Sequence, residues 1–122
     1  MNILKDAVLL RIFIGETDRC ESHPLYEAIV LKAREIGMAG ATVLRGPLSY
    51  GRSSGMHSAK ILRLSDDLPI VIEIVDSQEQ IDKFLPVLDP MIQSGLATIE
   101  KVQVVRFGDA QDGLPAKDAK SA

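Results

Sequence analysis

The chain has 122 residues, of which 46% are hydrophobic and 25% are charged, and these values fit one ordinary globular domain. Its formal net charge is only −3, which disfavours nonspecific electrostatic binding to nucleic acid or to acidic membranes. Aromatic residues make up 4% with no tryptophan, which argues against a base-stacking platform, and no apolar stretch approaches the roughly 18 residues of a membrane span.

The first half of the chain has the pattern strand, helix, strand. Residues 7–14 are rich in Val, Leu, Ile and Phe, which predicts the first strand. A polar connection then leads to a helix, with Ser22 or His23 as its cap and Pro24 in its first turn. Apolar residues recur at helical spacing after it, and residues 41–45 are expected to form the second strand.

The second half repeats this order. Residues 68–75 are again rich in β-branched side chains and predict the third strand. Ser77 and Gln80 have the spacing of a capping box, so a second helix is expected to begin there and to end at Gly95. Residues 97–107 are expected to form the last strand.

The order β-α-β, long connection, β-α-β predicts an α+β fold of the ferredoxin-like βαββαβ plan. In that plan an antiparallel sheet carries two helices on one face, and a long loop joins strands 2 and 3. We expect one domain over residues 1–108. Residues 109–122, with Leu114 as their only large apolar side chain, are expected to be a poorly packed tail.

The N-terminal apolar run is expected to be a buried strand and not a signal peptide, because Asp6 and Arg11 interrupt it and no small-residue cleavage site follows. Cys20 is the only cysteine, so it can form no intrachain disulfide, which favours a reducing compartment. A cytoplasmic location is therefore expected.

The strands are apolar on both faces, although two helices can cover only one face of the sheet. Burying one Val, Leu, Ile or Phe side chain is worth roughly 1.5–3 kcal/mol, so a second apolar face is costly to leave in water. A second copy of the chain would cover it, which predicts a compact homo-oligomer. In the first strand, one side has Val8, Leu10, Ile12 and Ile14, and the other has Ala7, Leu9 and Phe13.

Arg11 interrupts the first strand with a charged side chain, and Glu73 in the third strand is its expected partner.

The connection over residues 45–67 is far longer than the about two to five residues that a hairpin turn needs. Its glycines permit turns that bring backbone N–H groups toward an anion, and its arginines can hold a phosphate with two parallel hydrogen bonds. Its tyrosine can lie against a ligand base or another chain. A flexible polar loop with solvated charges is the alternative. The candidate contacts here are Arg45, Tyr50, Gly51, Arg52 and Ser53.

The chain offers no evident catalytic or metal constellation. His23 and His57 are the only histidines, and neither stands in a recognisable metal-ligand spacing. Cys20 could act as a nucleophile only with a base brought close in space. We therefore expect neither catalysis nor a metal centre.

Four segments in succession resemble a widespread family of small prokaryotic proteins that have no assigned activity and are classed as PII-like. The resemblance spans about residues 4–107. The segments are GETDR (15–19), HPLYEAIVLKAREIGMAGATVLRG (23–46), SAKILRLSDDLPIVIEIVD (58–76) and FLPVLDPM (84–91).

The wider PII resemblance implies a function. PII proteins are trimers of ferredoxin-like subunits that bind adenine nucleotides in clefts between subunits, and their long loop docks on transporters or enzymes. SYGRSSG, residues 49–55, resembles the start of that loop. The resemblance implies ligand contacts near the adenine from Gly37 and Gly40, near the phosphates from Gly51 and Arg52, and elsewhere in the site from Gly95 and Arg106.

The sequence thus predicts a cytoplasmic, homotrimeric signalling protein without catalytic activity. Its effector would be a small anion, an adenine nucleotide, bound between subunits, and no other cofactor is expected. The loop of about residues 46–60 would then present itself to a transporter or an enzyme, with no binding of nucleic acid and no membrane insertion. The alternatives are a trimeric metal-handling protein of the copper-tolerance type and a small enzyme that uses the same cleft.

Overall fold

The computed structural model describes residues 5–47 and 68–105, so the tail predicted over residues 109–122 and most of the long connection lie outside the described residues. The elements that it contains follow the predicted order, with a short hairpin added before the first helix. They are β1 (Lys5–Gly15), β2 (Arg19–Cys20), β3 (His23–Pro24), α1 (Leu25–Ile36), β4 (Thr42–Arg45), β5 (Pro69–Asp76), α3 (Gln78–Leu88), the 3-10 turn η1 (Asp89–Met91) and β6 (Leu96–Val104).

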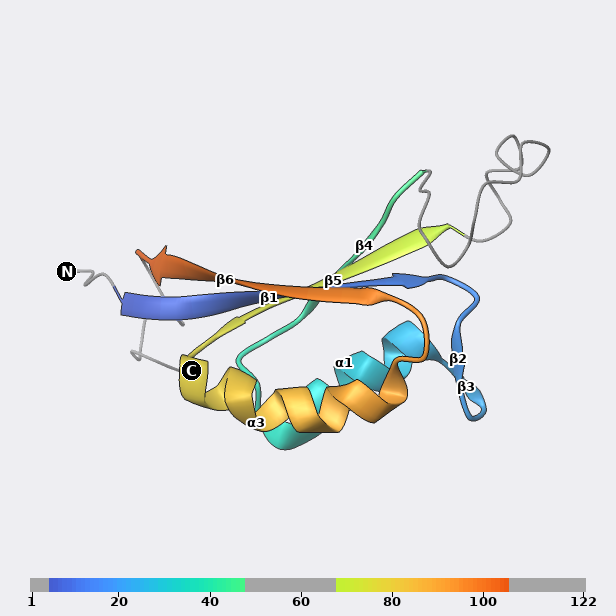
Figure 1. Cartoon of the computed structure of the whole chain (residues 1–122), viewed down its shortest axis with the longest axis horizontal. Coiled ribbons are helices and arrows are strands. Elements are labelled where there is room, and N and C mark those ends of the chain that lie inside the picture. The colour runs from blue at the N-terminus through green and yellow to red at the C-terminus, as the bar shows by residue number, and fades with distance from the viewer. Residues whose placement is uncertain (1–4, 48–67, 106–122) are drawn as a thin grey trace, which may run out of the picture.

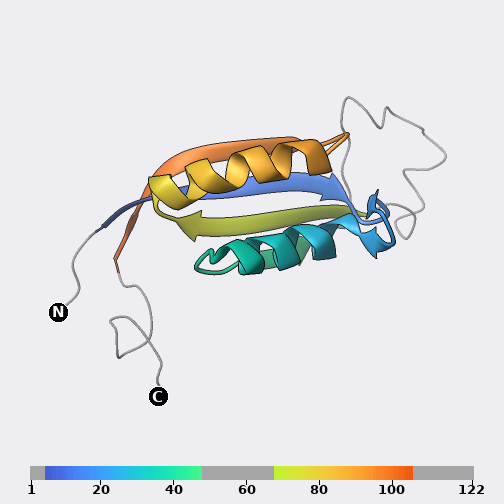
Figure 2. The same cartoon turned by 90° about the horizontal axis from the view of Figure 1, so that it is seen from below.

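The main sheet has four strands in the order β4-β5-β1-β6, and every neighbouring pair is antiparallel. Figure 1 shows α1 and α3 together on one side of this sheet, and Figure 2 shows them side by side in front of it. This is the predicted α+β, ferredoxin-like arrangement, and it is confirmed. Its strand order follows from the two β-α-β units, because each crossover leaves room for a strand of the other unit.

The core lies between the sheet and the two helices. Alternate residues of β1 and β5 point toward the helices, and the apolar stripe of each helix points back toward the sheet, as the period-2 and period-3.6 patterns predict. Each of these side chains is less than 9% exposed. They are Val8, Leu10, Ile12 and Ile14 of β1, Ile70, Ile72 and Ile74 of β5, Leu25, Ile29 and Ala33 of α1, Ile81, Phe84 and Leu88 of α3, and Met38.

The start of α1 differs from the prediction. Pro24 is the N-cap residue, and no side chain caps the helix. His23 and Pro24 belong to the small hairpin, where they pair with Cys20 and Arg19. The first amide, that of Leu25, donates instead to the carbonyl oxygen of Asp18 at 2.7 Å. The expected cap by Ser22 or His23 is therefore wrong, because a tertiary backbone contact satisfies this donor.

The start of α3 agrees with the prediction, and its end does not. The Ser77 hydroxyl accepts a hydrogen bond from the amide of Gln80 at 3.2 Å, which confirms the predicted cap. The helix ends at Leu88 and not at Gly95, and a 3-10 turn follows. Pro90 explains the early end, because it has no amide hydrogen with which to continue the helix.

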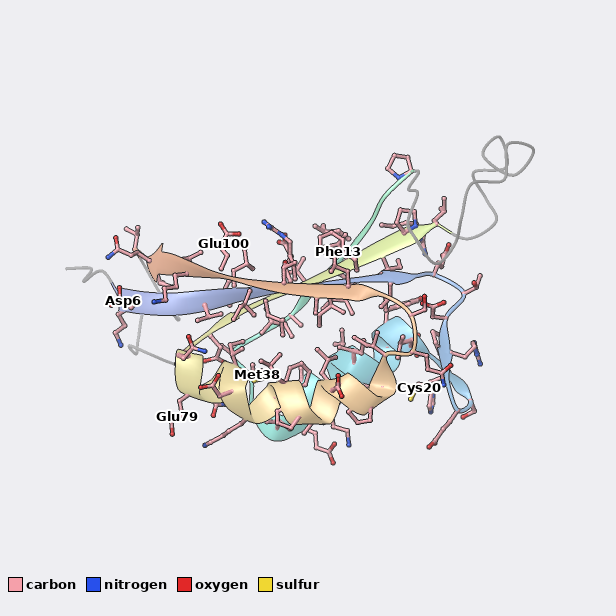
Figure 3. All side chains as sticks on the ribbon, viewed as in Figure 1. Asp6, Phe13, Cys20, Met38, Glu79 and Glu100 are labelled. Atoms are coloured by element: carbon pink, nitrogen blue, oxygen red, sulfur yellow. The ribbon has the colours of Figure 1, made fainter. Side chains whose placement is uncertain are left out.

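No described element covers the other face of the sheet, and Figure 3 shows Phe13 and Glu100 pointing away from the helices on this side. We call it the open face. The register places Phe13 between Val71 and Leu96, and the exposed fractions of Phe13 and Leu96 are 37% and 58%. Leu44 and Val75 lie on the same face and are 48% and 37% exposed. The prediction of a second apolar face is thereby confirmed.

An ion-pair cluster lies on the open face. Arg11 and Glu73 are paired across β1 and β5, and Arg11 Nε lies 2.8 Å from Glu73 Oε2, as predicted. Arg11 Nη1 also lies 3.5 Å from Glu100 Oε1 on β6. The hydrogen bond to Glu73 raises the pKa of the Arg11 guanidinium, so the group stays charged.

Candidate functional site

Four of the predicted ligand-binding residues lie in the described part of the chain, namely Gly37, Gly40, Arg45 and Gly95. The other five, Tyr50, Gly51, Arg52, Ser53 and Arg106, lie outside the described residues.

Gly37 ends α1 in the left-handed conformation, with φ at 95°. The backbone amides of Gly37 and Met38 both donate hydrogen bonds to the carbonyl oxygen of Ala33, in the last turn of the helix. A side chain at Gly37 would be strained in this conformation, so helix termination alone explains the glycine. The predicted end of α1 is confirmed, and Gly37 needs no ligand to account for it.

A hollow of 220 Å³ lies beside Gly40, at the turn that joins α1 to β4. We call this the α1–β4 hollow. Its apolar part comes from α1 and from the turn that follows it, and Arg34 adds a positive charge. Within the described part of the chain, the Arg34 guanidinium has no ion pair or side-chain hydrogen bond. The lining residues are Val30, Ala33, Arg34, Met38, Ala39, Gly40 and Ala41.

Gly40 is the glycine that the described subunit does not explain. Its backbone is not left-handed, and a Cβ placed there would meet no atom within 4 Å. Neither a turn nor a close contact within the described residues therefore requires a glycine here. The bare backbone leaves room for another molecule to approach, which is consistent with the predicted role of Gly40.

Arg34 was not among the ligand-binding residues predicted from the sequence. In the sequence, Arg34 is simply a basic residue in the last turn of a helix. Such residues are common there because a positive charge interacts favourably with the negative end of the helix dipole, so the position gave no sign of ligand binding. The contribution of Arg34 to the hollow depends on how the chain turns after Gly37.

Arg45 and Gly95 lie at the other end of the sheet. Arg45 pairs with Ile70 and Ile70 with Ile14, which places Arg45 near the C-terminal end of β1. Gly95 is near the same end, because a Cβ there would stand 2.7 Å from the carbonyl oxygen of Phe13. This close approach to backbone explains Gly95 without a ligand.

Gly37 and Gly40 lie near the opposite end. The amide of Ala39, which precedes Gly40, donates to the carboxylate of Asp76 at 2.8 Å, and Asp76 pairs with Val8 in the first half of β1. Within one subunit, the four described ligand-binding candidates therefore form two groups, one at each end of the sheet. A single site could contain both groups only if they came from different subunits.

Arg45 also holds the base of the long connection together. Its Nη2 lies 2.5 Å from Glu16 Oε2, in the segment that follows β1. The next amide, that of Gly46, donates to the carbonyl oxygen of Pro69 at 2.8 Å. Arg45 and Gly46 thus connect the end of β4 to β5 and to the segment that follows β1, at the point where the long connection begins. Glu16 compensates the charge of Arg45.

These assignments predict opposite effects of alanine at two glycines. Gly95→Ala should lower the free energy of unfolding by about 1–3 kcal/mol, because the new methyl group meets backbone at 2.7 Å. Gly40→Ala should leave it unchanged or raise it by up to about 1 kcal/mol, because the position is open. Urea denaturation of both variants and of the wild type measures these differences in the free energy of unfolding. Equal effects of the two substitutions would contradict the distinction.

The described residues hold no group of three or more His, Cys, Asp and Glu side chains placed to bind a metal ion. The Cys20 thiol is half-buried. Neither of the two described helices has the length and apolar character of a membrane span.

Sequence comparison identifies the family. The model of the family DUF190, described as "Uncharacterized ACR, COG1993", matches residues 7–104. The chain belongs to the DUF190 family. Among its relatives, a UPF0166 protein of Aquifex aeolicus (strain VF5) is 38% identical over 97 residues, which cover 80% of this chain and 91% of that protein. A UPF0166 protein of Methanocaldococcus jannaschii is 37% identical over 101 residues, or 82% of this chain and 93% of that protein.

A solved structure has the same fold as this DUF190 protein. CPII, a nitrogen regulatory PII-like protein from Thiomonas intermedia K12, superposes with a TM-score of 0.65 at 24% identity. The match covers 85% of this chain and 92% of the CPII chain, and that CPII structure is bound to ADP, AMP and bicarbonate. The likeness is one of fold. The resemblance to a family of small proteins of unassigned function is confirmed by the DUF190 match, and the fold is the one that CPII has.

Proposed function

We propose that this DUF190 protein is a PII-like regulatory protein that binds an adenine nucleotide between the subunits of a homotrimer and has no catalytic activity. The observation that carries the proposal is the α1–β4 hollow, where Gly40 leaves bare backbone beside apolar side chains and the charge of Arg34. An apolar pocket with one cation suits a flat base attached to an anion. CPII, which has the same fold, is bound to ADP and AMP, and this supports the choice of ligand.

The open face supports the homotrimer. A contiguous surface that exposes Phe13, Leu44, Val75 and Leu96 is unfavourable in water, and its burial stabilises a complex. Both partners of such a complex would be copies of this chain.

Assembly would also complete the site. The residues near Gly40 in one subunit would face the Arg45 and Gly95 end of a neighbouring subunit. The remaining predicted contacts, Tyr50, Gly51, Arg52, Ser53 and Arg106, would join that second group. In this proposal the loop of about residues 46–60 transmits the bound state to a transporter or an enzyme, and the protein acts in the cytoplasm.

Calorimetric titration tests the ligand. AMP, ADP, ATP and cyclic AMP are each added to the purified protein, and at least one is expected to bind with saturation below millimolar concentration. Heats indistinguishable from dilution for all four nucleotides at millimolar concentration would remove the nucleotide from the proposal. Elemental analysis of the same protein tests the metal-handling alternative.

Filling the α1–β4 hollow provides the matching variant. Gly40→Val places two methyl groups and a Cβ in the space beside Gly40, so the affinity for the bound nucleotide should fall at least tenfold. Glu79→Val is the control, because it adds the same side chain at an exposed position of α3, outside the hollow. Equal affinities of the Gly40→Val variant and the wild type would place the ligand elsewhere.

A further inference from the structure

We propose that Asp76 is a positioning residue that fixes the α1–β4 turn in the conformation the ligand requires. This inference rests on the proposed function, because it concerns the same hollow. Asp76 is the last residue of β5 and lines no part of the hollow itself. Its two carboxylate oxygens have separate partners. Oδ2 accepts from the amide of Ala39 at 2.8 Å, and Oδ1 accepts from the amide of Ser77 at 2.7 Å.

A second side chain from the same junction also contacts the turn. Gln80 Nε2 donates to the carbonyl oxygen of Gly37 at 3.4 Å, while the Gln80 amide is held by the Ser77 hydroxyl. Figure 2 shows the C-terminal end of α1 and the N-terminal end of α3 at the same end of the helix layer. The junction of β5 and α3 therefore holds the turn at Gly37 and at Ala39.

The hydrogen bond to Ala39 matters most for the hollow. The amides of Gly37 and Met38 are fixed by the end of α1, and Met38 is buried with an exposed fraction of 8%. Beyond Met38 the chain is exposed at Ala39 and Gly40, and within the described residues Asp76 supplies the hydrogen bond that holds it there. A charged acceptor makes such a bond stronger than a neutral one. Without it, the backbone beside the hollow would sample other conformations before the strand begins at Thr42.

The test compares Asp76→Ala, Asp76→Asn and Asp82→Ala. In Asp76→Ala, hydrogen exchange of the Ala39 amide measured by NMR should accelerate at least tenfold, and the affinity for ADP should fall about tenfold. Asp76→Asn should give intermediate values, because a carboxamide has one oxygen acceptor for two amides. Asp82 lies on the exposed side of α3, and within the described residues its side chain accepts only from the Gln78 side chain, so Asp82→Ala should change neither quantity.

Two results would overturn the inference. One is an Ala39 exchange rate in Asp76→Ala within twofold of the wild type, and the other is an unchanged affinity for ADP despite faster exchange. If the wild type binds no nucleotide, the proposed function fails, whereas the exchange rate still decides whether Asp76 holds the turn. If Asp76→Ala does not fold, Gln80→Ala removes the second contact and should accelerate exchange in the same turn by a smaller factor.

Discussion

Replacing Phe13 with glutamate is expected to give a folded monomer, with the sedimenting mass falling from three times the 13.3 kDa of one chain to 13.3 kDa. Phe13 lies between Val71 and Leu96 on the open face, where a partner subunit would remove a carboxylate from water without compensation. In the separated subunit the side chain is 37% exposed, so a glutamate there can reach solvent and the fold should survive.

Sedimentation equilibrium measures this mass, and circular dichroism checks the fold. Leu31→Glu is the matched control, because Leu31 is 55% exposed on α1, in the helix layer and away from the open face. It should leave the assembly intact. A wild-type mass of 13.3 kDa would remove the intersubunit site altogether. An assembled Phe13→Glu protein would mean that a different surface makes the contact.

Replacing Arg11 with methionine is expected to weaken the assembly at least tenfold. Arg11 compensates Glu73 at 2.8 Å and Glu100 at 3.5 Å, in the middle of an apolar face. Without the guanidinium, two carboxylates would be covered by the partner with no opposite charge from their own subunit. Methionine keeps the length and most of the apolar contact of the arginine stem, so the lost charge is the main change.

A double substitution separates charge from packing. In Arg11→Met with Glu73→Met the carboxylate nearest to the arginine is also removed, so part of the lost association should return. Lys83→Met is the control, because Lys83 lies on α3 and forms an exposed pair with Glu79 at 3.8 Å, away from the open face. The dissociation constant comes from sedimentation over a range of protein concentrations. A double variant no tighter than the single one would show that the ion pair does not set the affinity.

Much of the fold could be predicted from the sequence, because its strongest signals are local. Alternation in β1 and β5 separates the core face from the open face, and both faces are as expected. Gly37 ends α1 and Ser77 begins α3, since caps depend on residues only a few positions apart. The resemblance also pointed to a family of small proteins without an assigned activity, and the DUF190 match over residues 7–104 confirms such a family.

The candidate site depended on the tertiary structure. The family resemblance implied that Gly37, Gly40 and Gly95 contact a ligand between subunits, and only the structure shows that Gly95 lies at the opposite end of the subunit from the other two. Arg34 gained a role only when the turn brought it to the hollow beside Gly40.

The sequence by itself determined the order of the elements and the two faces of the sheet, because periodicity and capping act over one or two turns of chain. Only the tertiary structure decided that Asp76 holds Ala39, 37 residues away, and that Leu25 donates to Asp18 in place of a side-chain cap. Such contacts follow from strand register and helix placement. These are set by the burial of the whole core and have no signature in a short segment of sequence.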